Sequence, residues 1–397
     1  MFVPISNTPR NYAWGSTTDI AAVLGVAPSG SPEAELWLGA HPGSPARILN
    51  PDAVGGFGTL ADWVARDPAS AGLSEPRLPF LLKLLAADSP LSLQAHPSPE
   101  QAAEGFAREN AAGVPLNAPT RNYKDAFHKP ELIFALSDRF EALCGFRPVA
   151  DARADVDVLI AVPGLSAEAR TALRSFRSSL DGEDSEVLRR VVGSLLTEDV
   201  SVLVQAVTDA AAGAAATPAV DTVRLLAEHH PGDPGIVVSL LVHRVTLQRG
   251  EVLYLPAGNI HAYLRGFGVE LMAASDNVLR GGLTPKHIDV AELLSVLNFT
   301  PVPVPYLAAE RPADGVELYR PDVPDFELVH VAATRGMSST IDLPGAAIAI
   351  ATAGAVTLAG ASGRSDLGQG DAVYITADEG ALTVQGAGEL FVATTRL

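Results

Sequence analysis

The segment that decides the fold is GEVLYLPAGNIHAYL, residues 250–264. Gly250 is followed after five residues by Pro256, then by Gly258, and after two more residues by His261. Proline and glycine at this spacing predict a tight turn between two antiparallel strands. The turn is expected to direct His261 inward at the start of the second strand.

This spacing resembles the second motif of the cupin fold, although Arg265 stands where that motif usually has asparagine. Outward from it, residues 1–150 and 236–300 carry short apolar runs between glycines and prolines, which predict strands. We expect these two ranges to form one metal-binding cupin domain, a jelly roll. The expected elements include strands at 78–87 and 91–96 joined by the turn Asp88-Ser89-Pro90, a strand at 131–136, and a capped helix at 98–113. The first two strands are expected to pair through this turn, which would place Lys83 almost opposite Gln94 and His96.

The pattern changes between residues 151 and 235, where apolar residues recur at spacings of three and four. This periodicity predicts a helical insert domain. Residues 283–297 are typical of a short helix, and PVPVP at 301–305 of a stiff linker. The remainder, 306–397, shows short strands broken by glycine turns. The predicted fold class is therefore mainly β with an α-helical insert.

The C-terminal range contains a second copy of the turn pattern in altered form. It begins at Gly370, but Thr376, Asp378 and Ala381 stand where the first copy has proline, glycine and histidine. We therefore expect residues 306–397 to form a degenerate cupin domain that binds no metal.

The run LSLQAHP places Ser92, Gln94 and His96 on one face of a strand. Burying this polar set is costly without a purpose, although a solvent-facing strand is the alternative. Glu131 heads an apolar strand and is either a satisfied strand end or a metal ligand. With His261, the residues Gln94, His96 and Glu131 offer two oxygen and two nitrogen ligands, a set that suits zinc or another divalent first-row metal.

Lysine is scarce, since four of the 28 basic residues are lysine and the rest are arginine. Arginine cannot easily replace a compact, titratable ammonium, so clustered lysines indicate a site for an anion. Arg280 lies six residues before Lys286, across Gly281-Gly282, and the two can converge on a phosphate. A charged loop before a helix is the alternative. The lysines are Lys83, Lys124, Lys129 and Lys286.

The formal net charge is −18 and the pI about 4.8. Such a surface repels nucleic acid and anionic lipid, so neither is expected as a partner. No apolar stretch approaches the roughly 20 residues of a membrane span, and the first residues do not have the pattern of a signal peptide. The one cysteine, Cys144, fits a reducing cytoplasm. We expect a cytoplasmic monomer that binds a small anion.

Several segments are distinctive: SLQAHP, NYKDAFHKPE, PAGNIHAYLRGFGVE and SDNVLRGGLTPK, together with NYAWG and AELWLGAHP near the N-terminus. They resemble the signature segments of the type I mannose-6-phosphate isomerases, over roughly residues 1–300. The departure at Ala126-Phe127 touches no expected ligand. The resemblance implies a metal-dependent conversion between mannose 6-phosphate and fructose 6-phosphate through an enediolate. It implies one zinc ion bound by Gln94, His96, Glu131 and His261.

The resemblance also implies which residues line the substrate pocket. Moving a proton between C1 and C2 requires an acid/base group, and Lys83, His128, Lys129 and Glu270 are the candidates. Arg280 stays protonated and is expected to bind charge. A metal-dependent cupin dioxygenase or a non-catalytic sugar-phosphate-binding cupin is the alternative. The implied catalytic residues are Lys83, His128, Lys129, Glu270, Asp276 and Arg280, and the implied phosphate-binding residues are Ser92, Arg280 and Lys286.

Overall fold

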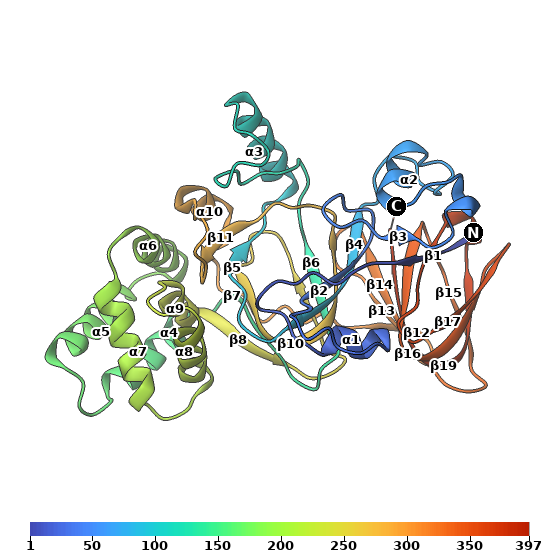
Figure 1. The fold of residues 1–397 in the computed structure, drawn as a ribbon. Helices are drawn as coiled ribbons and strands as arrows, with labels where there is room; N and C mark the ends of the chain where they lie inside the picture. Colours follow the sequence, from blue (N-terminus) through green and yellow to red (C-terminus); the bar gives the residue numbers. More distant parts are fainter. Residues whose placement is uncertain (397) are drawn as a thin grey trace.

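The protein, described over residues 1–396 by a computed structural model, has three regions in a row (Figure 1). A helical region lies at one end, a β-rich region in the middle, and a second β-rich region at the other end. The strands form a nine-stranded and a ten-stranded sheet whose pairings are antiparallel. The mainly β architecture with a helical insert agrees with the prediction.

Strand β10 (His261–Ala273) organises the nine-stranded sheet. Its first part pairs with β5 (Leu93–Ala95) and β7 (Phe140–Phe146), and its second part with β4 (Phe80–Ala87) and β6 (Glu131–Ala135). A register shift in the pairing with β7 marks the passage between the two parts. The remaining strands of this sheet are β2 (Glu35–Leu38), β8 (Val242–Leu247), β9 (Val252–Leu255) and β11 (Leu279–Gly282).

The predicted hairpin between β4 and β5 is not formed. Both strands are antiparallel to β10 and follow one another along it, since Ala87 lies opposite Gly266 and Gln94 lies opposite His261. The two strands therefore run in the same direction. The residues that connect them form a bend, and the backbone N–H groups of Asp88 and Ser89 in this bend donate hydrogen bonds to the Trp14 carbonyl oxygen. The bend is therefore held against the N-terminal segment.

The ten-stranded sheet takes in the N-terminal residues. Strand β1 (Phe2–Ser6) pairs with β18 (Ala372–Ile375), and β3 (Arg47–Ile48) pairs with β1. This differs from the predicted division, which assigned all of residues 1–150 to the metal-binding domain. The other strands are β12 (Glu310–Ala313), β13 (Val316–Tyr319), β14 (Glu327–Ala333), β15 (Ser338–Ile341), β16 (Ala347–Ala359), β17 (Arg364–Gly368) and β19 (Leu382–Thr394).

Helices occupy the range predicted for the insert. Their apolar faces, with Leu173, Val192 and Leu226 among the buried residues, share a core with Leu93 of the central sheet. Burying each such side chain contributes about 1.5–3 kcal/mol, which attaches the insert firmly to the sheet. The helices are α4 (Val149–Ile160), α5 (Ala167–Ser179), α6 (Asp184–Thr197), α7 (Ser201–Gly213), α8 (Pro218–His229) and α9 (Gly235–Val238).

The remaining helices lie outside the insert. Helix α3 (Pro99–Ala111) is capped by Ser98 as predicted. Helix α10 (Val290–Val296) covers only the second half of the predicted range 283–297. The first half forms a loop that ends at Asp289, the N-cap residue of the helix. Two short helices were not predicted from the sequence, namely α1 (Asp19–Leu24) and α2 (Leu60–Arg66).

The altered turn in the C-terminal sheet keeps the backbone form of the first copy. Gly370 has a φ of 85° and Gly250 a φ of 90°, and each glycine leads into a strand followed by a turn. A residue other than glycine is strained at such angles. The expected degenerate cupin domain thus keeps the strand pattern, and its lack of a metal stays a prediction.

The two sheets share a hydrophobic core and an ionic contact. The Phe134 ring of β6 lies 4.9 Å from the Phe391 ring of β19. Between the sheets, Arg249 donates two hydrogen bonds of 2.8 Å to the Glu389 carboxylate. Burial alone would raise the pKa of Glu389, but hydrogen bonds from His330 and Thr352 and the charge of Arg249 lower it to about 2.

We expect Glu389→Gln to lower the free energy of unfolding at pH 7 by about 2 kcal/mol. Because the folded pKa lies below the ordinary value, the carboxylate's contribution is present above about pH 4.5 and is lost as the pH falls toward 2. Denaturant unfolding between pH 7 and pH 3 should show the variant and the wild type converging. The exposed Glu310→Gln is the control, and a pH-independent difference for Glu389→Gln would contradict the expectation.

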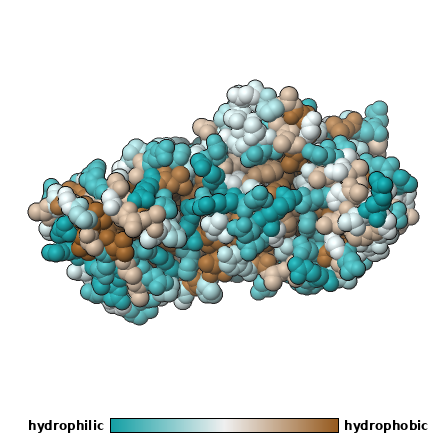
Figure 2. All heavy atoms as spheres, turned by 90° about the horizontal axis from the view of Figure 1, so that it is seen from below, coloured by the Kyte–Doolittle hydropathy of each residue, from teal (hydrophilic) through white to brown (hydrophobic). Residues whose placement is uncertain are grey.

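Hydrophilic residues cover much of the surface on the face in Figure 2, with hydrophobic patches between them, one over the helical end. Within the described part of the chain, no single helix is long and apolar enough to span a membrane. The pair α6 and α7 meets the length and composition criteria only jointly, with a bend of 106° between its helices.

Candidate metal centre and substrate cavity

Three buried side chains converge on one point in the central sheet. His96 follows β5, Glu131 begins β6 and His261 begins β10. Their candidate ligand atoms all lie within 4.8 Å of one another. His96 Nε2 is 3.3 Å from Glu131 Oε1, and His261 Nε2 is 3.3 Å from Glu131 Oε2. Each of the three residues is at most 2% exposed, so the cluster is shielded from water.

The backbone orients both imidazole rings. His96 Nδ1 lies 2.8 Å from the carbonyl oxygen of Asn277, and His261 Nδ1 lies 3.0 Å from that of Asn259. A proton on each Nδ1 satisfies these carbonyls and leaves each Nε2 as a lone pair facing Glu131. Burial lowers the pKa of His96 to about 4, so its ring is neutral, as a metal ligand must be.

Two buried atoms without hydrogen-bond partners indicate that this cluster suits a cation. His96 Nε2 and Glu131 Oε2 are buried without a hydrogen-bond partner in the described structure. Buried acceptors that face one another are costly unless a positive charge lies between them. Burial would raise the pKa of Glu131, but the ammonium of Lys129, at 3.1 Å, holds it well below its ordinary value. The cluster therefore presents an ionised carboxylate and two imidazoles to a cation.

Gln94 reaches the same cluster from β5. Its Nε2 lies 3.2 Å from His261 Nε2, and Gln94 is the residue opposite His261 in the β5–β10 pairing. A half-turn of the amide exchanges its nitrogen and oxygen. The structure thus brings together the four side chains predicted from the sequence as ligands.

The predicted turn before His261 is present. Gly258 has a φ of 76°, and its N–H donates a 2.8 Å hydrogen bond to the His96 carbonyl. A Cβ at this position would lie 3.0 Å from the Val296 carbonyl oxygen. Glycine is therefore required both for the angle and for the space, and the turn links the segments that carry the two histidines.

A cavity of about 450 Å³ opens beside the cluster, with Gln94 and Lys129 in its wall. Arg280 of β11 is the residue opposite Gln94 in the β5–β11 pairing. The side chains of Arg280 and Lys286 make no ion pair or hydrogen bond within residues 1–396. Two unpaired cations in a chain of net charge −18 create a local site for an anion. The predicted residues in the wall are Lys83, Ser92, Gln94, Lys129, Asp276, Arg280 and Lys286.

Comparison with known proteins places the chain in a family. Residues 2–149 match the profile "Phosphomannose isomerase type I, catalytic domain". The mannose-6-phosphate isomerase of Escherichia coli (strain K12) is 39% identical over 396 residues, which cover 97% of each chain. The human mannose-6-phosphate isomerase is 35% identical over 82% of this chain and 81% of its own.

The chain belongs to the type I phosphomannose isomerase family.

A solved structure supports the same assignment. The mannose 6-phosphate isomerase from Salmonella typhimurium, bound to fructose 6-phosphate and zinc, matches with a TM-score of 0.86 and 34% identity. The match covers all of both chains, including the helical insert and the C-terminal sheet. The predicted cupin fold is therefore confirmed for this phosphomannose isomerase family member.

Lys83 lies elsewhere in the sheet than the sequence suggested. It was expected opposite the ligands of β5, but it pairs with Glu270 of β10 and Trp37 of β2. Its Nζ is 2.9 Å from Glu270 Oε2, 3.6 Å from Glu35 Oε1 and 5.0 Å from the Trp37 ring. Burial alone would lower the pKa of Lys83, but these carboxylates raise it, so it stays charged.

Three further predicted residues occupy distinct places in this family member. His128 Nε2 is paired with Asp325 at 2.7 Å, and His128 does not line the cavity. That position does not support the predicted catalytic role. Glu270 is buried behind the cavity wall as the partner of Lys83. Asp276 does line the cavity, and its carboxylate lies 3.1 Å from His41 Nε2.

Sequence reasoning missed several wall residues. Glu35 and Trp37 alternate along β2 and belong to the quoted segment AELWLGAHP, which was the available signal. His230 comes from the end of the helical insert, and nothing in its local sequence pointed to the cavity. Asn277 was also missed, but it is fully buried and does not line the cavity. Its side chain accepts a hydrogen bond from the Lys124 N–H and donates one to the Asp125 carbonyl.

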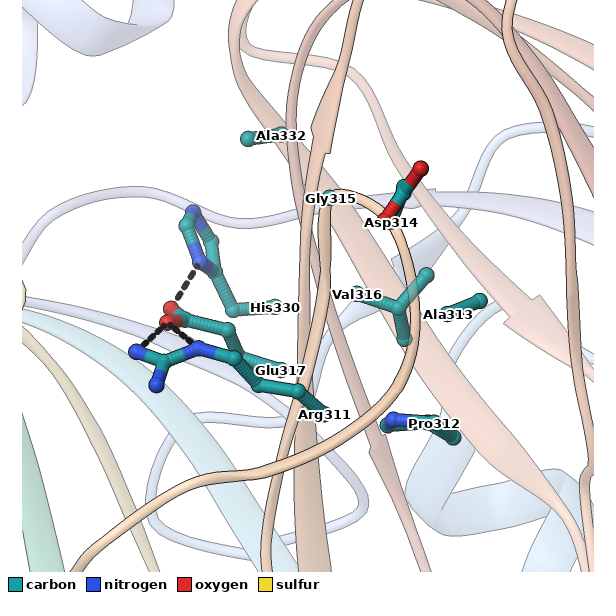
Figure 3. A pocket seen from close by; sticks show the side chains of 9 residues that line it. All are labelled: Arg311, Pro312, Ala313, Asp314, Gly315, Val316, Glu317, His330 and Ala332. Carbon is teal, nitrogen blue, oxygen red and sulfur yellow. Dashed lines mark hydrogen bonds and ion pairs between the residues drawn. The ribbon is translucent and has the colours of Figure 1, made fainter.

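A second cavity, of about 490 Å³, lies in the C-terminal sheet (Figure 3). Its basic residues are paired, since the Glu317 carboxylate binds both Arg311 and His330. Among its described lining residues, this cavity therefore offers no unpaired cation. It is a weaker candidate for an anion site than the cavity beside the His–Glu–His cluster.

Proposed function

We propose that this chain is a metal-dependent aldose–ketose isomerase that interconverts mannose 6-phosphate and fructose 6-phosphate. The observation that carries the proposal is the joint placement of two features next to one another at the same cavity. A buried His–Glu–His cluster with an adjacent glutamine lies beside two unpaired cations, Arg280 and Lys286. The first suits a divalent metal and the second suits a phosphate.

The metal we propose is one zinc ion, held by Gln94, His96, Glu131 and His261. When bound, it would supply Lewis-acid stabilisation of negative charge on the sugar oxygens. Arg280 and Lys286, with Ser92 in the same wall, would hold the phosphate and so fix C1 and C2 of the sugar relative to the rest of the cavity.

The proton transfer is assigned by elimination among the predicted candidates. His128 points to Asp325, and Glu270 is buried against Lys83. Lys83 stays charged, so its role is to donate hydrogen bonds to developing negative charge. Lys129 lines the cavity next to Glu131 and remains the proposed proton-transferring residue.

The alternative functions fit less well. His96, Glu131 and His261 alone would also suit a non-haem iron oxygenase, which uses two histidines and one carboxylate. Gln94 as a fourth donor and the pair Arg280 and Lys286 have no role in that chemistry. A protein that only binds sugar phosphate would not require Lys129 between the cavity and the metal ligand Glu131.

A coupled assay tests the proposal. The purified protein should form fructose 6-phosphate from mannose 6-phosphate, should lose this activity on chelation, and should regain it with zinc. Formation of product at an unchanged rate after complete metal removal would contradict the metal requirement. Absence of isomerisation in a zinc-loaded, folded protein would refute the function.

We expect Arg280→Ala to lower kcat/KM for mannose 6-phosphate by about 10- to 100-fold, because a charge-assisted contact contributes about 1.5–3 kcal/mol. Most of the loss should appear in KM, and zinc content should stay normal. The control is Arg265→Ala, since Arg265 is exposed and does not line the cavity. A wild-type kinetic profile in folded Arg280→Ala would contradict the assignment.

We further infer that the substrate is a free sugar phosphate and that the protein acts as a cytoplasmic monomer without nucleic-acid or membrane partners. The acidic pI of about 4.8 and the buried, unpaired Cys144 support this setting.

A further inference from the structure

The exit of the helical insert touches the phosphate-binding side of the cavity. Asp233 lies in the turn between α8 and α9, and its carboxylate accepts three backbone hydrogen bonds. One comes from Gly235 at 2.7 Å, and two come from Leu283 at 2.8 Å and Thr284 at 3.2 Å. The insert thus holds a loop that lies about fifty residues further along the chain.

The loop that Asp233 binds has an unfavourable backbone. Leu283 has a φ of 56° and is the one non-glycine residue with a positive φ in the range 1–396. This conformation is unfavourable for a residue that carries a side chain, so surrounding contacts must maintain it. The Leu283 side chain is also buried, at 1% exposure, in the core shared with the insert.

The two segments approach too closely for other side chains. A Cβ on Gly235 would lie 2.9 Å from the Leu283 nitrogen, and a Cβ on Gly282 would lie 2.9 Å from the Gly235 Cα. Gly282 itself has a φ of 127°. The turn of the insert and the loop are therefore in backbone contact, with the Asp233 carboxylate as the bond between them.

The loop forms one wall of the cavity. Leu283, Thr284 and Lys286 all line it, and so does Arg280 within β11. The backbone N–H of Lys286 donates a 3.1 Å hydrogen bond to Thr284 Oγ1. The position of Thr284 therefore determines the position of the Lys286 backbone. His230 lines the same cavity from the turn that carries Asp233. An ordered loop thus places a cation and backbone groups for the phosphate.

We propose that Asp233 of the helical insert is a positioning residue that fixes the segment 282–286 for binding the substrate's phosphate group. It acts through the loop and does not itself contact the reacting atoms. This inference rests on the proposed function, and it gives the helical insert a direct part in substrate recognition.

The test compares Asp233→Ala and Asp233→Asn with the wild type. We expect Asp233→Ala to raise both KM for mannose 6-phosphate and Ki for inorganic phosphate about tenfold, since three hydrogen bonds that order the loop are lost. kcat should change by less than about threefold, because the metal and proton-transfer groups are untouched. Zinc content should equal that of the wild type. Asp221→Ala is the control, because Asp221 is an exposed residue of α8 that binds only Arg224.

Asp233→Asn separates positioning from folding. It retains one acceptor oxygen for Gly235 and Leu283, so the fold should survive, and Ki for inorganic phosphate should rise only about threefold. An unchanged Ki and KM in both variants, with only a lowered Tm, would mean that Asp233 is merely structural and would overturn the proposal. If Asp233→Ala does not fold, an unchanged Ki in Asp233→Asn would overturn it equally.

A binding measurement keeps this proposal separate from the isomerase assignment. Inorganic phosphate should raise the Tm of the wild type and of Asp221→Ala, and raise that of Asp233→Ala much less at the same concentration. This result would support the role of Asp233 even in a protein without isomerase activity. Equal stabilisation of all three proteins by phosphate would refute it, whatever their activity.

Discussion

Glu131→Ala should purify with less than about a tenth of the wild-type zinc and lose at least about 1000-fold in kcat/KM. Glu131 is the one anionic member of the cluster, and both its oxygens face histidine nitrogens at 3.3 Å. Without it, two neutral rings and an amide remain, and the cluster no longer offers a negative charge to a cation. A 1000-fold loss corresponds to about 4 kcal/mol of transition-state stabilisation.

The isosteric Glu131→Gln separates loss of charge from loss of volume. It should fold and still bind zinc poorly, as measured by elemental analysis after dialysis. The matched control is Glu389→Gln, because it removes a partly buried, cation-bound carboxylate from the other sheet and should keep its zinc. Full zinc occupancy in both Glu131 variants would show that Glu131 is not a ligand.

The second large effect is expected at Lys83. Lys83→Arg keeps the charge but should lower kcat at least about tenfold, with normal zinc content. The Nζ lies in a closed space between Glu270, Glu35 and the Trp37 ring, and the residue is only 5% exposed. A planar guanidinium is too large for this space and would move the carboxylates or its own donors. We expect a similar loss for Lys129→Arg.

Lys124→Arg is the comparison for these variants. Its Nζ donates to the carbonyl oxygens of Leu116 and Ala118 in the loop after α3, so an arginine can extend toward solvent there. Turnover and zinc should be measured in all three purified proteins. Near-wild-type kcat in Lys83→Arg would show that the site needs only a positive charge, and the scarcity of lysine elsewhere in the chain would then carry no meaning.

The convergence of the four candidate metal ligands could be predicted because local sequence determines their placement. The turn at Pro256 and Gly258 directs His261 inward through local backbone geometry, independently of contacts with distant parts of the chain. The alternation along LSLQAHP places Gln94 and His96 together. The same alternation explains why Lys129, two residues before Glu131, contacts it, whereas His128 faces the opposite side and binds Asp325.

The pairing of β4 could not be predicted from its own residues. All eight residues of β4 are buried, so the strand has no apolar–polar alternation to set its register or its neighbours. Its partner β10 lies far along the chain, and a tight turn such as Asp88–Pro90 is equally compatible with a hairpin or a bend. The role of Asp233 was hidden for a related reason, because hydrogen bonds from a distant backbone leave no pattern in the sequence.

The pairing of β1 with β18 has a consequence for how the molecule is made. Phe2 lies opposite Ile375, so β1 pairs with a strand that is synthesised 373 positions later. Closing so long a loop is entropically costly, and sheets with distant pairings fold slowly. The strands of the nine-stranded sheet, which holds the candidate metal centre, are all synthesised before the ten-stranded sheet can be completed. During that interval the nascent chain exposes an unpaired β1 and the apolar face that later packs against β19, which is the period when it is most prone to aggregate.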